Sequence, residues 1–310
     1  MQMISPHPQV LDRTIEPSIR QTVSQFADLL DETVNLGTNI FASDMHPASN
    51  GEENIAPTML FRHFVDLLDS ISILTRAATA DPSKVLLRAA FEVLLNLEYL
   101  FEKDTHKRAV TYLFCDILNQ IKVLEKLDPS TDTGKAFKAL FATTKNVAQT
   151  RSGNSKNIRD QINRKWAVLQ QPRYTDIFST YVEFKKNKVR KTPWYRYDSQ
   201  HSSIEQLAKH LNRSGMYELY YRKWSGSTHG TDVYLGKVSN NICEGVDIIG
   251  LRSPKDLQEV TQIALTFSLL VFELYVKNRV PSQDSSFNNW RAAIASHYKV
   301  ISGPPLIIVK

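Results

Sequence analysis

The chain has 310 residues, of which 42% are hydrophobic and 23% charged, values that fit a globular protein and exclude a disordered or collagen-like chain. Its two cysteines, Cys115 and Cys243, are too few for a disulfide framework or a four-cysteine zinc site. Lys and Arg number 38 against 32 Asp and Glu, and the resulting net charge of +6 attracts polyanions only mildly.

Targeting and membrane signals are weak. The N-terminal residues MQMISPHP lack the basic and apolar regions of a secretory signal peptide. The most apolar stretch, residues 261–276, is shorter than the roughly 20 residues needed to span a bilayer and contains Glu273. We therefore expect a buried core helix there, a cytoplasmic location and no membrane partner.

Helical periodicity dominates the first half of the chain. Apolar residues recur three and four positions apart over 16–36, 57–78 and 105–127, which predicts amphipathic helices. Segment 82–102 is apolar on nearly every face, as is typical of a helix in the core.

Two helix starts have the same local pattern. Asp81-Pro82 and Ser253-Pro254 each place a capping residue before a proline, which favours the first turn of a helix. The second of these is expected to open a long helix over 254–279.

Strand signals are few. They are the short segment 232–235 and the apolar tail 304–309, which could form an edge strand or dock in a groove of the same or a neighbouring chain. Expected loops are residues 42–54, 150–157, 187–202 and 236–253, and none separates two domains convincingly. The sequence thus predicts an all-α, multi-helix bundle forming a single domain over 1–310, with about eight to ten helices and at most a short C-terminal strand.

Positive charge is concentrated in residues 135–196. This segment contains fifteen Lys and Arg against three Asp and Glu, a net charge of +12. Basic and aromatic residues alternate at its end, where cations could meet nucleic-acid phosphates and rings could stack on bases. The candidate nucleic-acid-binding residues are Lys185, Lys186, Lys188, Arg190, Lys191, Trp194 and Arg196. The alternative is a solvated helix face followed by a loop.

Residues 215–230, GMYELYYRKWSGSTHG, form the candidate catalytic segment. At roughly 100° per residue of an α-helix, one face about two turns long carries four polar side chains. These are Tyr221, Arg222, Ser225 and His229, and Gly230 is placed to end the helix.

Such a face has chemical use. His229 could take the proton of an RNA 2′-hydroxyl near neutral pH, and Arg222 could stabilise the charge that develops on the phosphate. Tyr221 and Ser225 could orient the substrate or a water molecule. The alternative is a set of structural hydrogen bonds that fix helix packing.

Arg88 and Glu92 are charged residues within the apolar segment 82–102. They lie four residues apart and therefore share a face of the helix. Buried charges are costly unless paired, so they form either a structural ion pair or part of a polar pocket shared with residues 215–230.

Metal and cofactor signatures are missing from the sequence. The other histidines are scattered, and none is paired with cysteine at a zinc-like spacing. No Gly-rich phosphate loop, HExxH or GxSxG sequence occurs. We therefore expect no cofactor and no metal.

Two segments together resemble a helical bacterial family, the domain of unknown function 5677. The first, residues 87–99, carries Arg-x-x-x-Glu on an apolar helix, matched by Arg88 and Glu92. The second runs from Trp194 to Gly230 and ends in Tyr-x-x-x-Ser-x-x-x-His-Gly. Its last four motif positions are matched by Tyr221, Ser225, His229 and Gly230. The resemblance covers roughly residues 60–275.

A looser resemblance is to the HEPN superfamily of helical proteins, many of which are metal-independent ribonucleases in toxin and antiviral defence systems. Their motif is Arg, four to six residues, then His, and six residues separate Arg222 from His229. Lys223 departs from the uncharged polar residue that often follows the Arg in active members. The resemblance implies a HEPN-like core, a homodimer with a composite site, and an antitoxin or defence-system partner.

The leading hypothesis is a HEPN-like, metal-independent endoribonuclease with RNA as its partner. Arg222, His229, Tyr221 and Ser225 would form its catalytic site, with Arg88 and Glu92 lining the pocket or supporting it. One alternative is a non-catalytic module that binds a small ligand or nucleic acid through the polar pocket. The other is a structural scaffold.

Overall fold

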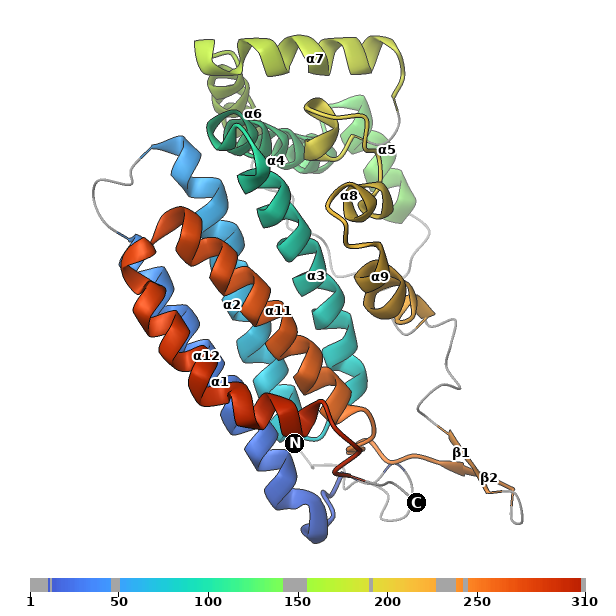
Figure 1. Cartoon of the computed structure of the whole chain (residues 1–310). Coiled ribbons are helices and arrows are strands. Elements are labelled where there is room, and N and C mark those ends of the chain that lie inside the picture. Colours follow the sequence, from blue (N-terminus) through green and yellow to red (C-terminus); the bar gives the residue numbers. More distant parts are fainter. Residues whose placement is uncertain are drawn as a thin grey trace. The chain divides into compact units, whose positions relative to one another are not determined.

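The computed structural model describes residues 11, 13–45, 51–141, 155–189, 192–226, 238–241 and 245–307 (Figure 1). The chain groups into two compact units: unit 1 comprises 1–50, 57–102 and 204–310, and unit 2 comprises 51–56 and 103–203. Helices dominate both units, which confirms the all-α class. A single domain over the whole chain remains a prediction, and each unit is described by itself.

Unit 1 is built on long helices. They are α1 (Pro17–Asp44), most of α2 (Glu52–Arg76), α3 (Ala80–Glu102), α11 (Leu257–Arg279) and α12 (Asp284–Ile301), with the short 3-10 turn η5 (Pro281–Gln283) before the last. The helix α11 contacts α1, α3 and α12, so it lies at the centre of the bundle (Figure 1). The helices expected over 16–36, 57–78, 82–102 and 254–279 are confirmed, and α1 is longer than expected.

The core of unit 1 is aromatic. Phe61 stacks on Tyr275 with ring centroids 4.0 Å apart, and Phe272 packs beside Phe61 at 5.7 Å. The helix α11 is long and apolar enough to cross a membrane, but 61% of its most apolar window is buried inside the unit. Its apolar composition is therefore explained by packing against neighbouring helices, as in the core helix of a soluble protein.

A buried carboxylate ties the ends of three helices together. Asp44, the last residue of α1, is 4% exposed and accepts hydrogen bonds from Thr58 Oγ1 at 2.8 Å and Tyr275 Oη at 2.5 Å. Arg279 Nη2 donates to both of its oxygens at 2.9 and 3.1 Å. These contacts satisfy a charge that would be costly to bury alone.

The two expected capping pairs are displaced. The helix α3 begins at Ala80, so Asp81 and Pro82 lie inside its first turn. The residue before α11 is Asp256, with a left-handed φ of 66°, rather than Ser253. Both Asp81 and Asp256 pair with Lys84 instead.

Strands occur where a loop was expected. Within 236–253, β1 (Val238–Asn241) pairs with β2 (Gly245–Ile248) as an antiparallel hairpin, with Val238 opposite Ile248. The expected strand at 232–235 lies outside the described residues. The described part of the C-terminal tail, residues 304–307, is not a strand, and its Leu306 amide donates to Gln258 Oε1 at 2.7 Å.

Unit 2 contains four further helices and two 3-10 turns. They are α4 (Thr105–Leu127), α5 (Asp132–Phe141), α6 (Ser155–Leu169) and α7 (Thr175–Lys186), with 3-10 turns η2 (Pro172–Tyr174) and η3 (Trp194–Tyr197). Phe114 of α4 is fully buried and contacts the rings of Tyr174, Tyr181 and Tyr197 at 5.7, 6.2 and 6.0 Å. The helix expected over 105–127 is confirmed.

The first turn of α5 has no room for a side chain at Gly134, which lies against the turn that follows α4. A Cβ atom there would lie 1.8 Å from the Asp128 carbonyl oxygen, so Gly134→Ala must displace backbone. We expect it to lower the free energy of unfolding of unit 2 by about 1–3 kcal/mol, measured by urea denaturation. Gly215→Ala is the matched control, because nothing lies within 4 Å of its Cβ position. Equal stability of the two variants would contradict the crowded turn.

Candidate functional site

One face of α3 carries a row of polar side chains. Residues 84, 88, 92, 96, 98 and 102 are Lys, Arg, Glu, Asn, Glu and Glu, spaced so that they follow one side of an otherwise apolar helix. Residues 204–226, here called the docked segment, lie along this row. It contains α8 (Ile204–His210), α9 (Ser214–Met216) and the π-helical turn η4 (Tyr217–Arg222), and both α8 and η4 contact α3.

Charged contacts hold the first half of the docked segment. Glu102 Oε1 lies 2.8 Å from His210 Nε2. Glu98 accepts two hydrogen bonds from Arg213 Nε, at 3.0 and 3.2 Å, and one from Nη2 at 2.5 Å, the forked arrangement that carboxylates and guanidinium groups favour. The docked segment therefore runs antiparallel to α3.

Three side chains form a compact cluster at the next position along α3. The Tyr221 hydroxyl donates to Glu92 Oε1 at 2.7 Å, and the Arg88 guanidinium lies over the Tyr221 ring, 4.2 Å from its centroid. Cation–π and charge-assisted contacts of this kind strengthen when water is partly excluded. The structure thus brings together Arg88, Glu92 and Tyr221, three of the residues that the sequence selected.

The electrostatics of the cluster keep the tyrosine protonated. Burial raises the pKa of the Tyr221 hydroxyl, and the hydrogen bond to Glu92 raises it further, while Arg88 partly offsets both. A neutral hydroxyl near pH 7 can donate a hydrogen bond but cannot act as a general base. Tyr221 is therefore suited to orient a neighbouring group rather than to remove a proton.

Arg222 follows Tyr221 in the π-helical turn, and its guanidinium lies over the ring of Tyr217, 5.5 Å from the centroid, while that ring stacks on Tyr221 at 5.2 Å. The Lys223 amide bonds the Glu218 carbonyl five residues back, at 3.3 Å, so the turn is wider than that of an α-helix. The Arg222 side chain is 55% exposed and lies 3.1 Å from Glu218 and 3.3 Å from Glu205. Whether Arg222 and Tyr221 act together on one face of the segment remains a prediction.

The end of the docked segment is described in part. Trp224 is 3% exposed and Ser225 is half-buried. His229 and Gly230 lie outside the described residues. A π-helical turn inside a helical segment often marks a functional site, and this one directly precedes them.

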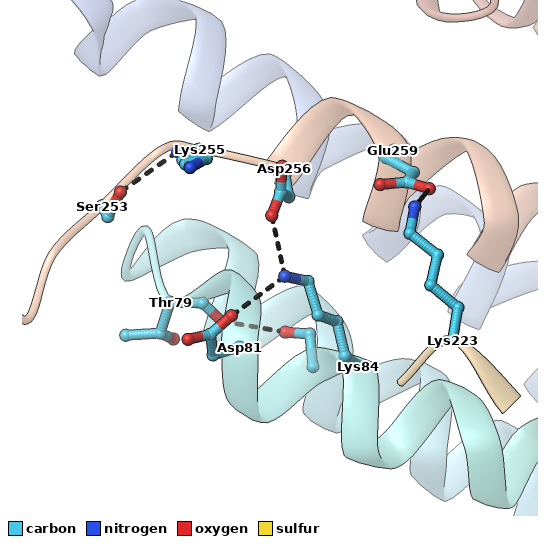
Figure 2. A network of polar contacts seen from close by, with 9 residues as sticks. Thr79, Asp81, Lys84, Lys223, Ser253, Lys255, Asp256 and Glu259 are labelled. Atoms are coloured by element: carbon cyan, nitrogen blue, oxygen red, sulfur yellow. Dashed lines mark hydrogen bonds and ion pairs between the residues drawn. The ribbon is translucent and has the colours of Figure 1, made fainter. Parts of the chain in front are cut away.

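A second polar network joins the starts of α3 and α11, and the sequence analysis missed it. Figure 2 shows Lys84 Nζ between Asp81 Oδ1 at 2.9 Å and Asp256 Oδ2 at 2.7 Å, and Lys223 Nζ 2.8 Å from Glu259 Oε1. Burial opposes the charge of Lys84, but hydrogen bonds to Asp256 and Asp81 outweigh it and raise the pKa of this ammonium group. The spacing of Asp81 and Lys84 could have indicated their pairing, whereas no local pattern points to Asp256.

The predicted nucleic-acid-binding residues belong to unit 2. Lys185, Lys186 and Lys188 are exposed, whereas Arg190 and Lys191 lie outside the described residues. Trp194 is only 8% exposed and meets Tyr112 edge to face at 5.4 Å, so its ring is not free to stack on a base. Arg196 lies over the ring of Phe184, 5.8 Å from its centroid.

The described residues also bear on the expectation that the protein holds no metal. In the parts of the chain that the structure describes, no three His, Cys, Asp or Glu side chains are grouped so that they could hold a metal ion.

The chain is thus a helical protein whose polar cluster joins a core helix to a π-helical segment. A family model, the family of unknown function DUF5677, matches residues 54–242, more than half of the chain, and the protein belongs to that family. The matched region contains α3 and the docked segment, and its description names no activity. Searches of curated proteins and of solved structures found no match.

The cluster makes a prediction for tyrosine titration. In Glu92→Gln the pKa of Tyr221 should fall, because the nearby negative charge is gone, and in Arg88→Met it should rise, because a positive charge is lost. NMR of protein labelled with ¹³C at the tyrosine Cζ atoms would follow this hydroxyl, identified by its loss in Tyr221→Phe. Shifts of the same sign in both variants would contradict the geometry.

Proposed function

We propose that the protein is a metal-independent endoribonuclease of HEPN-like type, acting in the bacterial cytoplasm as a toxin or antiviral defence effector. The observation that supports this most is the cluster of Arg88, Glu92 and Tyr221, which fixes the π-helical turn leading into Ser225 and His229. Acid–base catalysis requires a base held at a defined position, and the cluster anchors the described residues that precede His229 in the sequence.

In the proposed reaction His229 takes the proton of an RNA 2′-hydroxyl. The 2′ oxygen attacks the adjacent phosphorus, the bond from phosphorus to the 5′ oxygen breaks, and His229 donates its proton to that leaving oxygen. The products are a 2′,3′-cyclic phosphate and a 5′-hydroxyl. Arg222 stabilises the phosphate charge, and Tyr221 and Ser225 orient the reacting groups, while Arg88 and Glu92 position Tyr221.

The contacts of Arg222 bear on its role. Its exposed guanidinium reaches Glu205 through Nη2 and Glu218 through Nη1. A guanidinium has five N–H donors, so these two contacts leave others for a phosphate. The carboxylates also lower the net positive charge at this point, so phosphate binding competes with them.

A binding module without chemistry is the second candidate. It rests on the half-buried polar side chains of Arg88, Glu92 and Tyr221, which lie together where the docked segment meets α3. This candidate predicts that a ligand raises the melting temperature without being turned over. A scaffold role predicts loss of stability in Arg88→Ala with no binding or cleavage defect.

The test is RNA cleavage in EDTA by the parent protein, His229→Ala and Arg222→Ala, all shown to be folded by circular dichroism. Substrates are total tRNA and a long single-stranded RNA. Cleavage by the parent alone, leaving 2′,3′-cyclic phosphate ends, would support the proposal. Intact RNA in every reaction, or equal cleavage by His229→Ala, would contradict it.

A further inference from the structure

Charge divides between the two units. Unit 2 carries 20 Lys and Arg against 11 Asp and Glu, a net charge of +9, whereas unit 1 carries 18 against 21, a net charge of −3. The positive charge of the chain therefore belongs to unit 2, the unit that does not contain the polar cluster. A concentrated positive charge attracts nucleic acid through counterion release from its phosphates.

The aromatic side chains of unit 2 point inward. Trp166 of α6 meets Phe178 and Tyr181 of α7 at 6.5 and 6.4 Å, and this group surrounds Phe114. In the described residues between 155 and 197 no aromatic side chain is exposed. Five of these rings are half-buried and pack on one another, so the surface that accompanies the positive charge offers no fully exposed ring of the kind on which single strands stack.

The cations of unit 2 point outward. On α6, Lys156, Arg159 and Arg164 are exposed. At the end of α7, Lys185, Lys186 and Lys188 are exposed, and none of the three has an ion-pair partner in the described part of the chain. Lysines at a helix C-terminus also suit the helix dipole, which is their purely structural explanation.

Exposed cations with no fully exposed aromatic ring beside them contact the phosphates of a nucleic acid rather than its bases. A duplex offers more phosphate charge per unit length than a single strand, and A-form RNA is recognised largely through its backbone and shape. We propose that Lys185, Lys186 and Lys188 of unit 2 bind the phosphates of base-paired RNA without sequence preference. The choice of RNA over DNA rests on the proposed function. The assignment of the three lysines as a phosphate-binding surface is independent of that function.

The experiment measures binding with the full chain carrying His229→Ala, so that RNA stays intact. Probes are an RNA duplex of about 20 base pairs, enough to present two successive minor grooves, one of its strands alone, and the DNA duplex of the same sequence. The variant is Lys185→Gln/Lys186→Gln/Lys188→Gln. The control is Lys255→Gln/Lys277→Gln/Lys299→Gln, three exposed lysines of unit 1 whose replacement changes the net charge equally.

We expect the RNA duplex to bind at least about tenfold more tightly than the single strand, and the unit 2 variant to lose about tenfold in affinity. The slope of log affinity against log salt should fall by about one for each lysine replaced. The control should change affinity less than about twofold, because its lysines contact no phosphate.

Two results would overturn the inference: a single strand bound as tightly as the duplex, or equal losses in variant and control. A DNA duplex bound as tightly as the RNA duplex would overturn the choice of RNA. Failure of the proposed function is distinguishable from these. If the parent protein binds the duplex but cuts no RNA, the ribonuclease proposal is contradicted and the proposal of a duplex-binding surface is supported. If the parent protein cuts RNA but shows no preference for the duplex, the ribonuclease proposal is supported and the duplex-binding surface is contradicted.

Discussion

Replacing Asp44 with alanine is expected to lower the free energy of unfolding of unit 1 by about 3–5 kcal/mol, the cost of leaving a buried charge without its partner. The Asp44 side chain is 4% exposed and accepts hydrogen bonds from Thr58, Tyr275 and Arg279. In Asp44→Ala the guanidinium of Arg279, itself only 15% exposed, loses this carboxylate. Urea denaturation followed by far-UV circular dichroism measures the loss.

Asp28→Ala is the matched control, because Asp28 lies on the same helix and also pairs with an arginine. Its contact with Arg76 at 2.8 Å is exposed, with 65% of the Asp28 side chain accessible. Exposed pairs contribute little, so we expect a loss of at most about 1 kcal/mol. Asp44→Asn keeps the size and one acceptor oxygen and should fall between the two. A loss in Asp44→Ala no larger than in the control would show that the buried network does not stabilise unit 1.

His229→Ala is expected to lower the rate of RNA cleavage by about 100- to 10,000-fold, the range that a positioned general acid or base contributes. The proposal gives this imidazole both proton transfers, because histidine is the side chain whose unperturbed charge change falls near neutral pH. Single-turnover cleavage in EDTA, with enzyme in excess over RNA, measures this rate without a contribution from product release.

The control for this variant is His297→Ala. His297 is an exposed histidine on α12, away from the docked segment in sequence, and its loss removes the same side chain type. We expect its cleavage rate to equal that of the parent. If both variants cut RNA at the parent rate, the acid–base group lies elsewhere and the assignment of His229 is wrong.

The helices and part of the site could be predicted from local patterns. Apolar residues three and four positions apart placed α4 at its observed ends and α3 within two residues of its start. The same spacing put Arg88 and Glu92 on one face, and the family motif linked them to Tyr221. These predictions hold because helical periodicity depends on neighbours within one or two turns.

The π-helical turn Tyr217–Arg222 shows where the local pattern fails. An α-helix and a π-helix differ by one residue in the reach of each backbone hydrogen bond, and the sequence YELYYR is compatible with either. Docking on α3 accompanies the wider turn, in which Tyr221 bonds Glu92 while Arg222 pairs with exposed carboxylates. The position of Tyr221 therefore depends on a contact with α3, whereas the ion pairs of Arg222 lie within the docked segment itself.

The prediction that the Trp194 ring stacks on nucleic-acid bases also depended on local sequence alone. Its basic and aromatic neighbours indicate stacking on nucleic-acid bases, yet the ring is buried against Tyr112 of α4. Composition gives the residue types of a segment, but only packing decides whether a ring faces water or the core.

The sequence by itself determined the all-α class, the main helices, the family and the concentration of positive charge. Only the tertiary structure decided which charges pair, which rings are buried and how the chain divides into two units. Lys84 meets Asp256 across 172 positions, and Arg279 meets Asp44 across 235. Periodicity and capping act over a few residues, whereas burial and ion pairing depend on whatever the fold brings near, so such partners leave no trace in the local sequence.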